Sequence, residues 1–382
     1  MIKIPLSRPD ITEKETRAVL ETLKTPQLSL GPRLREFEQR IAEYTGVKYA
    51  VAVNSGTSAL HLIIRAMGVT EGDEVITTPF SFIASANCVL FEKAKPVFVD
   101  IDPLTLNMAP DLIEKKITGR TKAILAVDVF GHPAEWGRLE EIAGKHGLRL
   151  IEDSCEALGS EYNGRKTGSF GNAGAFAFYP NKQITTGEGG IIVTGNKRIS
   201  ELCESMRNQG RSPGDGWLGH TILGYNYRIS EINCALGIAQ MGRIDEILAK
   251  RAEVADIYNS RLKEIDDIDT PHISSRGIKI SWFVYVVRLK ENFSRAQRDM
   301  ILAGLRAEGI ECGDYFPPIH LQPLYRGISG YREGDFPVAE SVSERTIALP
   351  FYNNLSEEQI EYVVRTLKQV IFEVSKGREI RC

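Results

Sequence analysis

The chain lacks the features that would place it in a membrane, on nucleic acid or in an oxidising compartment. Its six cysteines are scattered, with no Cys-x-x-Cys pair and no metal-ligand spacing. No apolar run approaches membrane-spanning length, and the first ten residues contain no apolar core of signal-peptide length. The formal net charge of −3 provides no basic field for nucleic acid. We therefore expect a cytoplasmic protein with reduced thiols that binds neither membranes nor nucleic acid.

What the chain does contain is the composition of an ordinary globular protein. Hydrophobic residues make up 42% and charged residues 25% of its 382 residues. A chain of this length can bury a substantial core and commonly forms two domains. The pattern changes after Gly224, and we predict a large domain over 1–245 and a small one over 246–382.

Short apolar runs alternate with helical patterns over the first two-thirds of the chain. Such alternation is typical of a mainly parallel sheet that helices cover on both faces. Helical patterns over Ala59–Met67 and Trp136–His146 fit this arrangement. We therefore predict an α/β fold with one seven-stranded, mainly parallel sheet. The predicted strands are Tyr49–Val53, Glu74–Thr78, Pro96–Val99, Ala123–Val127, Leu148–Glu152, Ala175–Phe178 and Gly190–Thr194.

The last third of the chain indicates a smaller α+β unit. Apolar positions at helical spacing predict one long helix over Ile229–Ile265. An apolar, β-branched run predicts a strand over Trp282–Leu289. Two further helices are predicted over Ser294–Glu308 and Ser356–Phe372.

The clearest chemical signal is Lys182. An apolar, strand-like run ends at Pro180, and the lysine follows at once, before a loop rich in Thr, Gly and Glu. An amine in such a place can form a Schiff base with a carbonyl compound such as pyridoxal phosphate (PLP). A lone lysine is far more often a solvated surface residue. The interpretation therefore depends on other segments of the chain.

Two segments contain residues suited to an anion. Ser55, Gly56 and Thr57 lie where a strand gives way to a helix, and free N–H groups with the helix dipole attract anions there. The alternative is ordinary helix capping by Ser55 or Thr57. Asn226 and Arg228 lie between aromatic residues before a helix, where they could bind phosphate or carboxylate. The alternative is a solvated start of that helix.

Two other segments could contact a flat ring. Asp153 lies at the carboxyl end of an apolar strand, where ligands bind in open α/β sheets. A carboxylate there could pair with a protonated pyridine nitrogen, and the alternative is a helix N-cap. Phe82 follows another strand end and could stack on a ring. Most aromatic residues in such places belong to the core instead.

Taken together, these residues resemble the DegT/DnrJ/EryC1/StrS group of sugar aminotransferases. The resemblance runs from about Ile4 to Val370, nearly the whole chain. It implies the aspartate-aminotransferase-like (fold type I) architecture of PLP enzymes. The motifs that carry it are Ser55–Leu60, Glu152–Asp153, Asn181–Lys182 with Thr185–Gly190, Gly224–Arg228 and His320–Tyr325.

The resemblance also implies a role for each candidate residue. Lys182 is placed like the Schiff-base lysine that shuttles the proton, and Asp153 like the carboxylate on the pyridine nitrogen. The further cofactor contacts it implies are the Gly56 and Thr57 backbone at the phosphate, Phe82 on the ring, Glu156 near the phenolic oxygen, and Asn226 from the other subunit of a homodimer with shared sites. The residues it places toward the substrate are Arg228, Tyr315 and His320.

The chain departs from the family pattern at three positions. Ala177 stands where members usually carry a serine that helps bind phosphate, a contact worth about 1 to 3 kcal/mol if charge-assisted. Glu156 replaces the common Gln or His and is similar to perosamine-synthase-like members. Gln27 stands where many relatives have Trp, so substrate contacts at that edge could differ.

The implied activity is a ping-pong transfer of an amino group from glutamate to a nucleotide-linked ketosugar. A lysine at position 182, rather than the histidine of related 3-dehydratases, favours transamination. Glu156 and the Gly224–Arg228 run favour a 4-keto-6-deoxy sugar, with a 3-keto sugar as the alternative. A non-catalytic, PLP-fold regulatory or binding protein is a second alternative. A nucleotide-binding oxidoreductase is a third, because Gly214–Gly219 matches Gly-x-Gly-x-x-Gly, but no strand precedes it.

Overall fold

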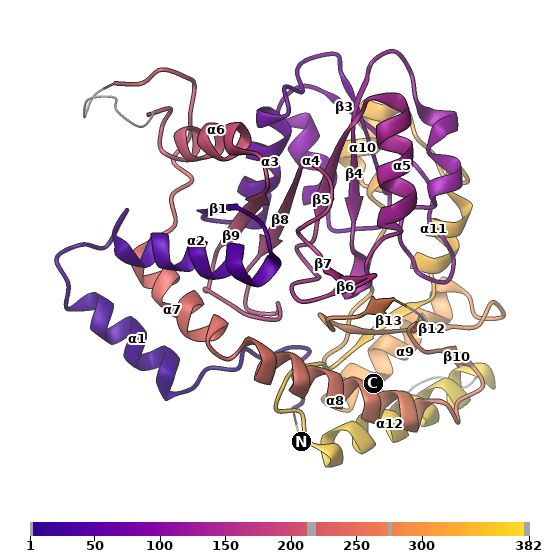
Figure 1. Cartoon of the computed structure of the whole chain (residues 1–382). Helices are drawn as coiled ribbons and strands as arrows, with labels where there is room; N and C mark the ends of the chain where they lie inside the picture. The colour runs from indigo at the N-terminus through magenta and orange to yellow at the C-terminus, as the bar shows by residue number, and fades with distance from the viewer. Residues whose placement is uncertain (1–2, 212–218, 274–276, 378–382) are drawn as a thin grey trace.

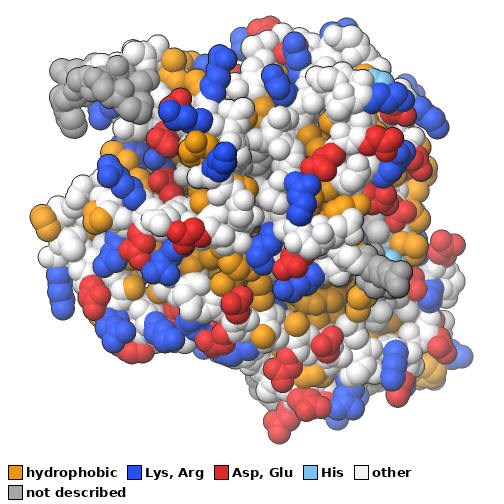
Figure 2. Space-filling view, viewed as in Figure 1, with side chains coloured by type: hydrophobic (Ala, Val, Ile, Leu, Met, Phe, Trp, Pro, Cys, Tyr) orange, Lys and Arg blue, Asp and Glu red, His pale blue; other side chains and the backbone are white. Residues whose placement is uncertain are grey.

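The computed structural model describes residues 3–211, 219–273 and 277–377 (Figure 1). Residues 214–218 of the Gly-x-Gly-x-x-Gly match lie outside the described residues. Acidic and basic side chains are interspersed over the face that Figure 2 shows, in keeping with the small net charge. No helix in the described part of the chain is long and apolar enough to cross a bilayer.

A seven-stranded sheet forms the centre of the larger part of the fold (Figure 1). Strand β9 runs antiparallel to both of its neighbours, and all other adjacent pairs are parallel. The predicted α/β fold is confirmed, and each predicted strand is present to within two residues at either end. In spatial order the strands are β1 (Tyr49–Val53), β9 (Gly190–Thr194), β8 (Ala173–Ala177), β5 (Arg149–Asp153), β4 (Thr121–Val127), β2 (Glu74–Thr77) and β3 (Lys95–Phe98).

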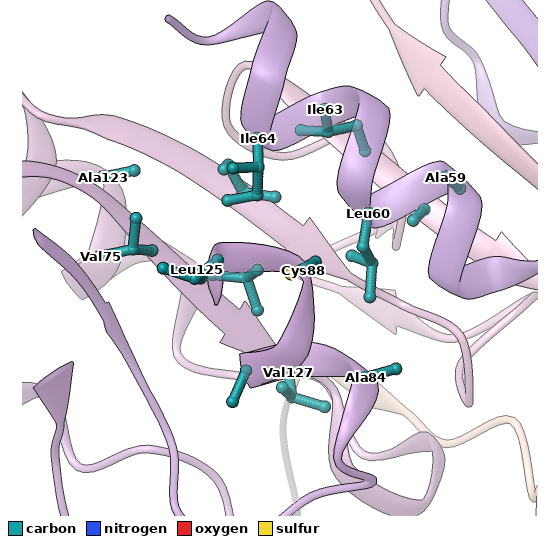
Figure 3. Packing of buried hydrophobic residues seen from close by; sticks show 14 of the residues in the cluster. Ala59, Leu60, Ile63, Ile64, Val75, Ala84, Cys88, Ala123, Leu125 and Val127 are labelled. Carbon is teal, nitrogen blue, oxygen red and sulfur yellow. The ribbon is translucent and has the colours of Figure 1, made fainter. Parts of the chain in front are cut away.

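Helices cover both faces of this sheet. Successive residues of a strand point to opposite faces, and on β4 the neighbours Ile124 and Leu125 therefore enter different clusters of buried side chains. Leu125 packs with Leu60 and Ile64 beneath α3 (Figure 3), whereas Ile124 packs with residues of α5. Helices that contribute to these two clusters include α3 (Gly56–Ala66), α4 (Ala84–Leu90), α6 (Lys197–Arg207) and α5 (Trp136–His146).

This packing fixes the sheet relative to α3, whose first residues line the cavity described below. Leu60 is about 1% exposed, and truncating such a leucine to alanine typically costs about 2–5 kcal/mol. A third cluster, which includes Phe37 and Phe178, packs α2 and α7 near β1 and β9. Two helices cross the amino-terminal region, α1 (Glu13–Leu23) and α2 (Pro32–Thr45).

The prediction of one long helix over Ile229–Ile265 is wrong. The chain forms two helices, α7 (Glu231–Met241) and α8 (Ile244–Leu262), with a break at Gly242 and Arg243. Arg243 is buried, and its guanidinium contacts the carboxylates of Asp10 at 3.2 Å and Glu15 at 3.0 Å. These distant partners hold Arg243 outside helical geometry, and no pattern within the segment itself reveals them.

The carboxyl-terminal region forms the predicted α+β unit around a second sheet. This sheet has the order β10 (Ile268–Asp269), β12 (Tyr285–Leu289), β13 (Thr346–Leu349). It packs with α8, α9 (Arg295–Ala307) and α12 (Glu357–Ser375). Ile4 enters this second core, while Ile319 and Tyr325 enter the core of the first sheet. The division at residue 245 stays a prediction.

The remaining elements are short and connect these two units. Strand β6 pairs with both β7 and β11 in a third sheet. The bounds are β6 (Glu161–Tyr162), β7 (Arg165–Lys166), β11 (Ile278–Lys279), α10 (Pro323–Ser329) and α11 (Pro337–Ser343), with short 3-10 helices at Pro110–Leu112, Glu114–Lys116, Val129–Gly131 and Ile319–Leu321.

Candidate active site

A cavity of about 620 Å³ lies at the carboxyl ends of strands β4, β5 and β8. Val127, Asp153 and Ala177 are the last residues of these strands, and all three line it. The carboxyl edge of a parallel sheet is the usual place for a ligand in open α/β folds. Seven of the predicted site residues line the cavity: Gly56, Thr57, Phe82, Asp153, Glu156, Lys182 and Tyr315.

Lys182 projects into this cavity from the turn that follows β8. Its backbone N–H donates to the carbonyl oxygen of Tyr179 at 2.9 Å, which fixes the turn. Its Nζ lies 3.8 Å from Oε1 of Glu156 and 3.8 Å from the ring centroid of Phe283. The side chain is 13% exposed. The amine is therefore held inside the cavity rather than on a solvated surface.

Glu156 is the acidic partner of this lysine. Its Oε2 accepts a hydrogen bond from the N–H of Phe130 at 2.9 Å. Burial raises the pKa of the Glu156 carboxyl above its ordinary value, and the charge of Lys182 opposes this rise. Glu156 and Lys182 thus face each other across a dry part of the cavity, where their interaction is stronger than in water.

Asp153 is fixed by two hydrogen bonds at the end of β5. Its Oδ2 accepts from the hydroxyl of Ser85 on α4 at 2.7 Å, and its Oδ1 accepts from the N–H of Cys155 at 3.2 Å. The hydroxyls of Ser85 and Ser81 lie 2.9 Å apart. Asp153 is buried, and both of its contacts orient the carboxylate at the cavity wall.

The amino-terminal end of α3 lies against the same cavity. Ser55 caps the helix by accepting from the N–H of Ser58 at 3.1 Å, and within the described residues the N–H groups of Gly56 and Thr57 have no hydrogen-bond acceptor. A Cβ added to Gly56 would lie 2.7 Å from Cβ of Ala177 and 3.0 Å from Sγ of Cys155. Free N–H groups at a helix start with no side chain in the way suit a phosphate group.

Aromatic side chains form another part of the wall. Phe82 is 60% exposed, so it does not belong to the hydrophobic core, which was the alternative for this residue. Tyr315 lines the cavity beside Phe316, and their rings stack at 5.1 Å between centroids. An exposed ring at a cavity wall is available to stack on a flat ligand.

Three predicted site residues lie elsewhere. Asn226 is exposed and forms a β-bridge with Asn208, and Arg228 donates to the side-chain oxygen of Asn208 at 3.1 Å. Neither lines the cavity of its own chain. His320 is fully buried, with its Nε2 2.9 Å from Oε1 of Glu340. Direct contact between His320 and a substrate therefore has no support in this geometry, because packing around α10 and α11 encloses the ring.

Several cavity residues escaped the sequence interpretation. Ser85 lies within the segment that drew attention to Phe82, but nothing local shows that it holds Asp153. Phe283 follows Lys182 by a hundred residues and reads as part of a buried strand. Asn181 belongs to the Lys182 motif, but the sequence interpretation assigned it no role; it lines the cavity, and its Oδ1 is buried without a hydrogen-bond partner within the described residues. Only the folded chain brings these residues together.

Comparisons with known proteins identify the family of the chain. Residues 9–368 match the family model described as the DegT/DnrJ/EryC1/StrS aminotransferase family. The chain belongs to this family. It is 39% identical to the GDP-perosamine synthase of Caulobacter vibrioides over 97% of this chain and 98% of that protein.

Two solved structures show the same fold. Helicobacter pylori PseC, an aminotransferase of pseudoaminic acid biosynthesis, has a TM-score of 0.93 at 32% identity, covering 97% of this chain and 100% of PseC. The PLP form of the putative sugar aminotransferase Spr1654 from Streptococcus pneumoniae has a TM-score of 0.93 at 30% identity, covering 98% of this chain and all of Spr1654. The predicted architecture is confirmed, and the protein is a PLP-dependent aminotransferase.

The residues of the cavity fit PLP. Its wall offers an amine, a fixed carboxylate, an exposed aromatic ring and a glycine turn with free N–H groups, which match the aldehyde, ring nitrogen, ring face and phosphate of the cofactor. Ala177 has no hydroxyl to add at the phosphate turn. Among the described residues, no group of three or more His, Cys, Asp or Glu could hold a metal ion.

Proposed function

We propose that this enzyme transfers the amino group of glutamate to the keto carbon of a nucleotide-linked sugar. The observation that carries the proposal is the presence of Lys182 and Asp153 in one cavity with the amino-terminal end of α3. The names of the GDP-perosamine synthase and of PseC support a sugar acceptor.

In this proposal Lys182 is the group that holds the cofactor and moves the proton. PLP, when bound, acts as an electron sink for the charge left at the α-carbon of an amino acid. The amine of Lys182 would have to be neutral to take the α-proton, and as the ammonium it would then return that proton on the cofactor side. Glu156 and Phe283 restrict the amine to one side of the cavity and keep its proton transfer directed.

Asp153 is proposed to hold a proton on the ring nitrogen of the cofactor. Its two hydrogen bonds keep the carboxylate in one orientation, so that no reorganisation is needed when charge develops. Phe82 is proposed to stack on the ring, and the N–H groups of Gly56 and Thr57 to bind the phosphate. Glu156 is proposed to lie at the phenolic oxygen.

We further propose that two copies of the chain share their active sites. Asn226 and Arg228 lie outside their own cavity, and Asn226 is exposed. A side chain in this position is available to the phosphate site of a partner. The loop that carries Asn226 and Arg228 also contacts the phosphate turn of its own chain, because the N–H of Asn54 donates to the carbonyl oxygen of Tyr227 at 3.0 Å. We propose that the dimer acts in the cytoplasm.

For the acceptor we propose a 4-keto-6-deoxy sugar. Glu156 and the similarity to the GDP-perosamine synthase support this choice over a 3-keto sugar. Tyr315 lines the cavity wall and is the proposed contact with the sugar. Its hydroxyl is a donor and an acceptor, as recognition of a sugar hydroxyl requires.

The test follows the two halves of the reaction separately. Glutamate added to the cofactor-loaded protein should shift the visible absorbance of PLP to that of pyridoxamine phosphate. The aminated protein should then be offered a panel of 4-keto and 3-keto nucleotide sugars, and the 4-keto compounds should restore the original band. An unchanged band with glutamate would favour the regulatory alternative, and restoration by 3-keto sugars alone would overturn the proposed regiochemistry.

A further inference from the structure

A chain of three buried polar side chains lies on the face of the sheet opposite the Asp153 carboxylate. Glu152 and Ser154 flank Asp153 along the chain and therefore point to the other face. There the Ser154 hydroxyl lies 2.6 Å from Oδ2 of Asp128 and 2.8 Å from Oε1 of Glu152. All three side chains have no exposed surface. We call this set the carboxyl bridge.

If both of its acids are ionised, the carboxyl bridge has too few hydrogen atoms for its two hydrogen bonds. A serine hydroxyl has one hydrogen, so it can donate to only one of its two carboxyl neighbours. If both carboxylates were ionised, the hydroxyl hydrogen would lie in one of the two short oxygen–oxygen contacts. The other contact would then join two acceptors with no hydrogen between them. A buried contact of this kind is strongly unfavourable. One of the two carboxyls must therefore carry a proton and donate it to the serine oxygen.

The neighbouring N–H groups identify which acid that is. Both oxygens of Glu152 accept from backbone N–H groups, Oε1 from Gly168 at 2.5 Å and Oε2 from Phe170 at 2.9 Å. On Asp128 both other donors, the N–H of Ala134 at 2.8 Å and the indole N–H of Trp136 at 3.0 Å, bind Oδ1. Within the described residues Oδ2 of Asp128 contacts only the serine hydroxyl, so it is the oxygen free to carry hydrogen.

We propose that Asp128 is a neutral acid that donates through Ser154 to an ionised Glu152, and that this bridge positions Asp153. The second part of this proposal, the positioning of Asp153, rests on the proposed function. The backbone N–H of Asp128 donates to the carbonyl oxygen of Asp153 at 3.1 Å, and the N–H of Ser154 donates to the carbonyl oxygen of Ala175 at 3.0 Å. The backbones of Asp128 and Ser154 thus join β5 to both neighbouring strands, and the side-chain contact between Ser154 and Asp128 adds a further link between β4 and β5 beside Asp153.

The charges around the carboxyl bridge agree with one proton. Glu152 and Asp153 are the acidic groups that face Asp128, and neither Asp128 nor Glu152 forms an ion pair with a cation in the described part of the chain. Burial raises the pKa of both carboxyls, that of Glu152 well above its ordinary value and that of Asp128 to about 7, against the effect of their hydrogen bonds. The two backbone N–H groups that Glu152 accepts are the observation that assigns the proton to Asp128. A raised folded-state pKa means that the neutral acid stabilises the fold at low pH, and that this contribution is lost as the pH rises through about 7.

The experiment compares Asp128→Asn with Glu152→Gln, a matched pair that places the same amide on either end of the bridge. The amide of Asp128→Asn can donate to Ser154 while its oxygen keeps both other donors. The amide of Glu152→Gln must face one of two backbone N–H groups. Thermal midpoints of the full-length protein, with and without PLP, are measured from pH 5 to pH 8.5.

The stability of Asp128→Asn relative to the wild type should increase from pH 5 to about pH 7 and then stay level to pH 8.5, because the wild-type contribution is lost between the unfolded and folded pKa values of Asp128. Glu152→Gln should be less stable at every pH. If instead Glu152→Gln is tolerated and Asp128→Asn is destabilising throughout, the proton belongs to Glu152 and the assignment is overturned. Parallel curves for Asp128→Asn and the wild type would also overturn it, because they would show that Asp128 does not change charge in this range.

The positioning of Asp153 has its own measurement. Ser154→Ala removes the shared hydroxyl, and the dissociation constant of PLP should rise about tenfold, while Asp128→Asn should leave it within about threefold of the wild type. Equal constants for Ser154→Ala and the wild type would refute the positioning role. The midpoints measured without PLP do not depend on amino transfer, so failure of the proposed function leaves the proton assignment standing.

Discussion

The phosphate turn offers the sharpest test of the site, through Gly56→Ala. The added Cβ would lie 2.7 Å from Cβ of Ala177, well inside the optimum of about 3.5–4.0 Å between carbon atoms. Overpacking of this kind costs about 1–3 kcal/mol, and the gain in helix propensity of Ala over Gly offsets up to about 1 kcal/mol. The turn must therefore shift, and PLP should bind about tenfold more weakly, with a lower thermal midpoint.

A second substitution decides whether this contact is the cause. Ala177→Gly removes the nearer of the two atoms that the new Cβ meets, leaving Sγ of Cys155 at 3.0 Å, so Gly56→Ala with Ala177→Gly should recover much of the lost affinity. The two changes should couple by about 0.5–3 kcal/mol. Gly144→Ala on α5 is the control, because a Cβ there has no neighbour within 4 Å, and it should leave PLP binding unchanged. The reasoning fails if Gly56→Ala binds PLP like the wild type, or if the double variant is no better than Gly56→Ala alone.

Four other substitutions test separate parts of the chain. Lys182→Ala should abolish the visible absorbance band of the lysine-bound cofactor, and a band that survives would refute the assignment. Asp153→Ala should reduce turnover to less than about a tenth of wild type while PLP affinity changes less, because its charge matters most in the transition state; higher residual turnover would argue against that role. Ala177→Ser should tighten PLP binding by about 1 kcal/mol if its hydroxyl reaches the phosphate, as seen in a spectral titration; unchanged affinity would mean that it does not. Arg243→Ala should destabilise the fold by about 3–5 kcal/mol in denaturant unfolding, because it leaves Glu15 buried without its cation and Asp10 with only Lys250, at 3.5 Å; a loss below about 1 kcal/mol would contradict this.

The sheet could be predicted from the sequence because its signal is local. Short apolar runs such as Gly190–Thr194 are rich in β-branched residues, and buried strands need such residues along their own length. The break in the predicted long helix could not be found in this way. Arg243 leaves helical geometry for Asp10 and Glu15, which lie more than two hundred residues away along the chain.

The residues of the site also divide into those that a local motif reveals and those whose contacts only the folded chain reveals. Gly56 begins α3, Asp153 ends β5 and Lys182 lies in the turn after β8, so a local motif is enough to select each of them. His320 also lies in a motif, but the motif carries no information about burial, and packing places the ring against Glu340. Phe283 reaches Lys182 from another part of the fold, and its own segment reads as a buried strand. Motifs therefore select candidate residues along the chain, whereas contacts between distant segments appear only in the folded chain.

The alternation of side chains at the end of β5 explains how several acidic residues can lie close together at this site. Glu152, Asp153 and Glu156 lie within five residues of one another, and Asp128 joins them from β4. Period-two alternation sends Asp153 to the cavity and Glu152 to the opposite face, where the carboxyl bridge holds it. On the cavity side Lys182 faces Glu156. If Asp128 is neutral, the two faces carry their charges separately, and Asp153 can remain the anion that faces the cofactor ring without a full second charge behind it from Asp128.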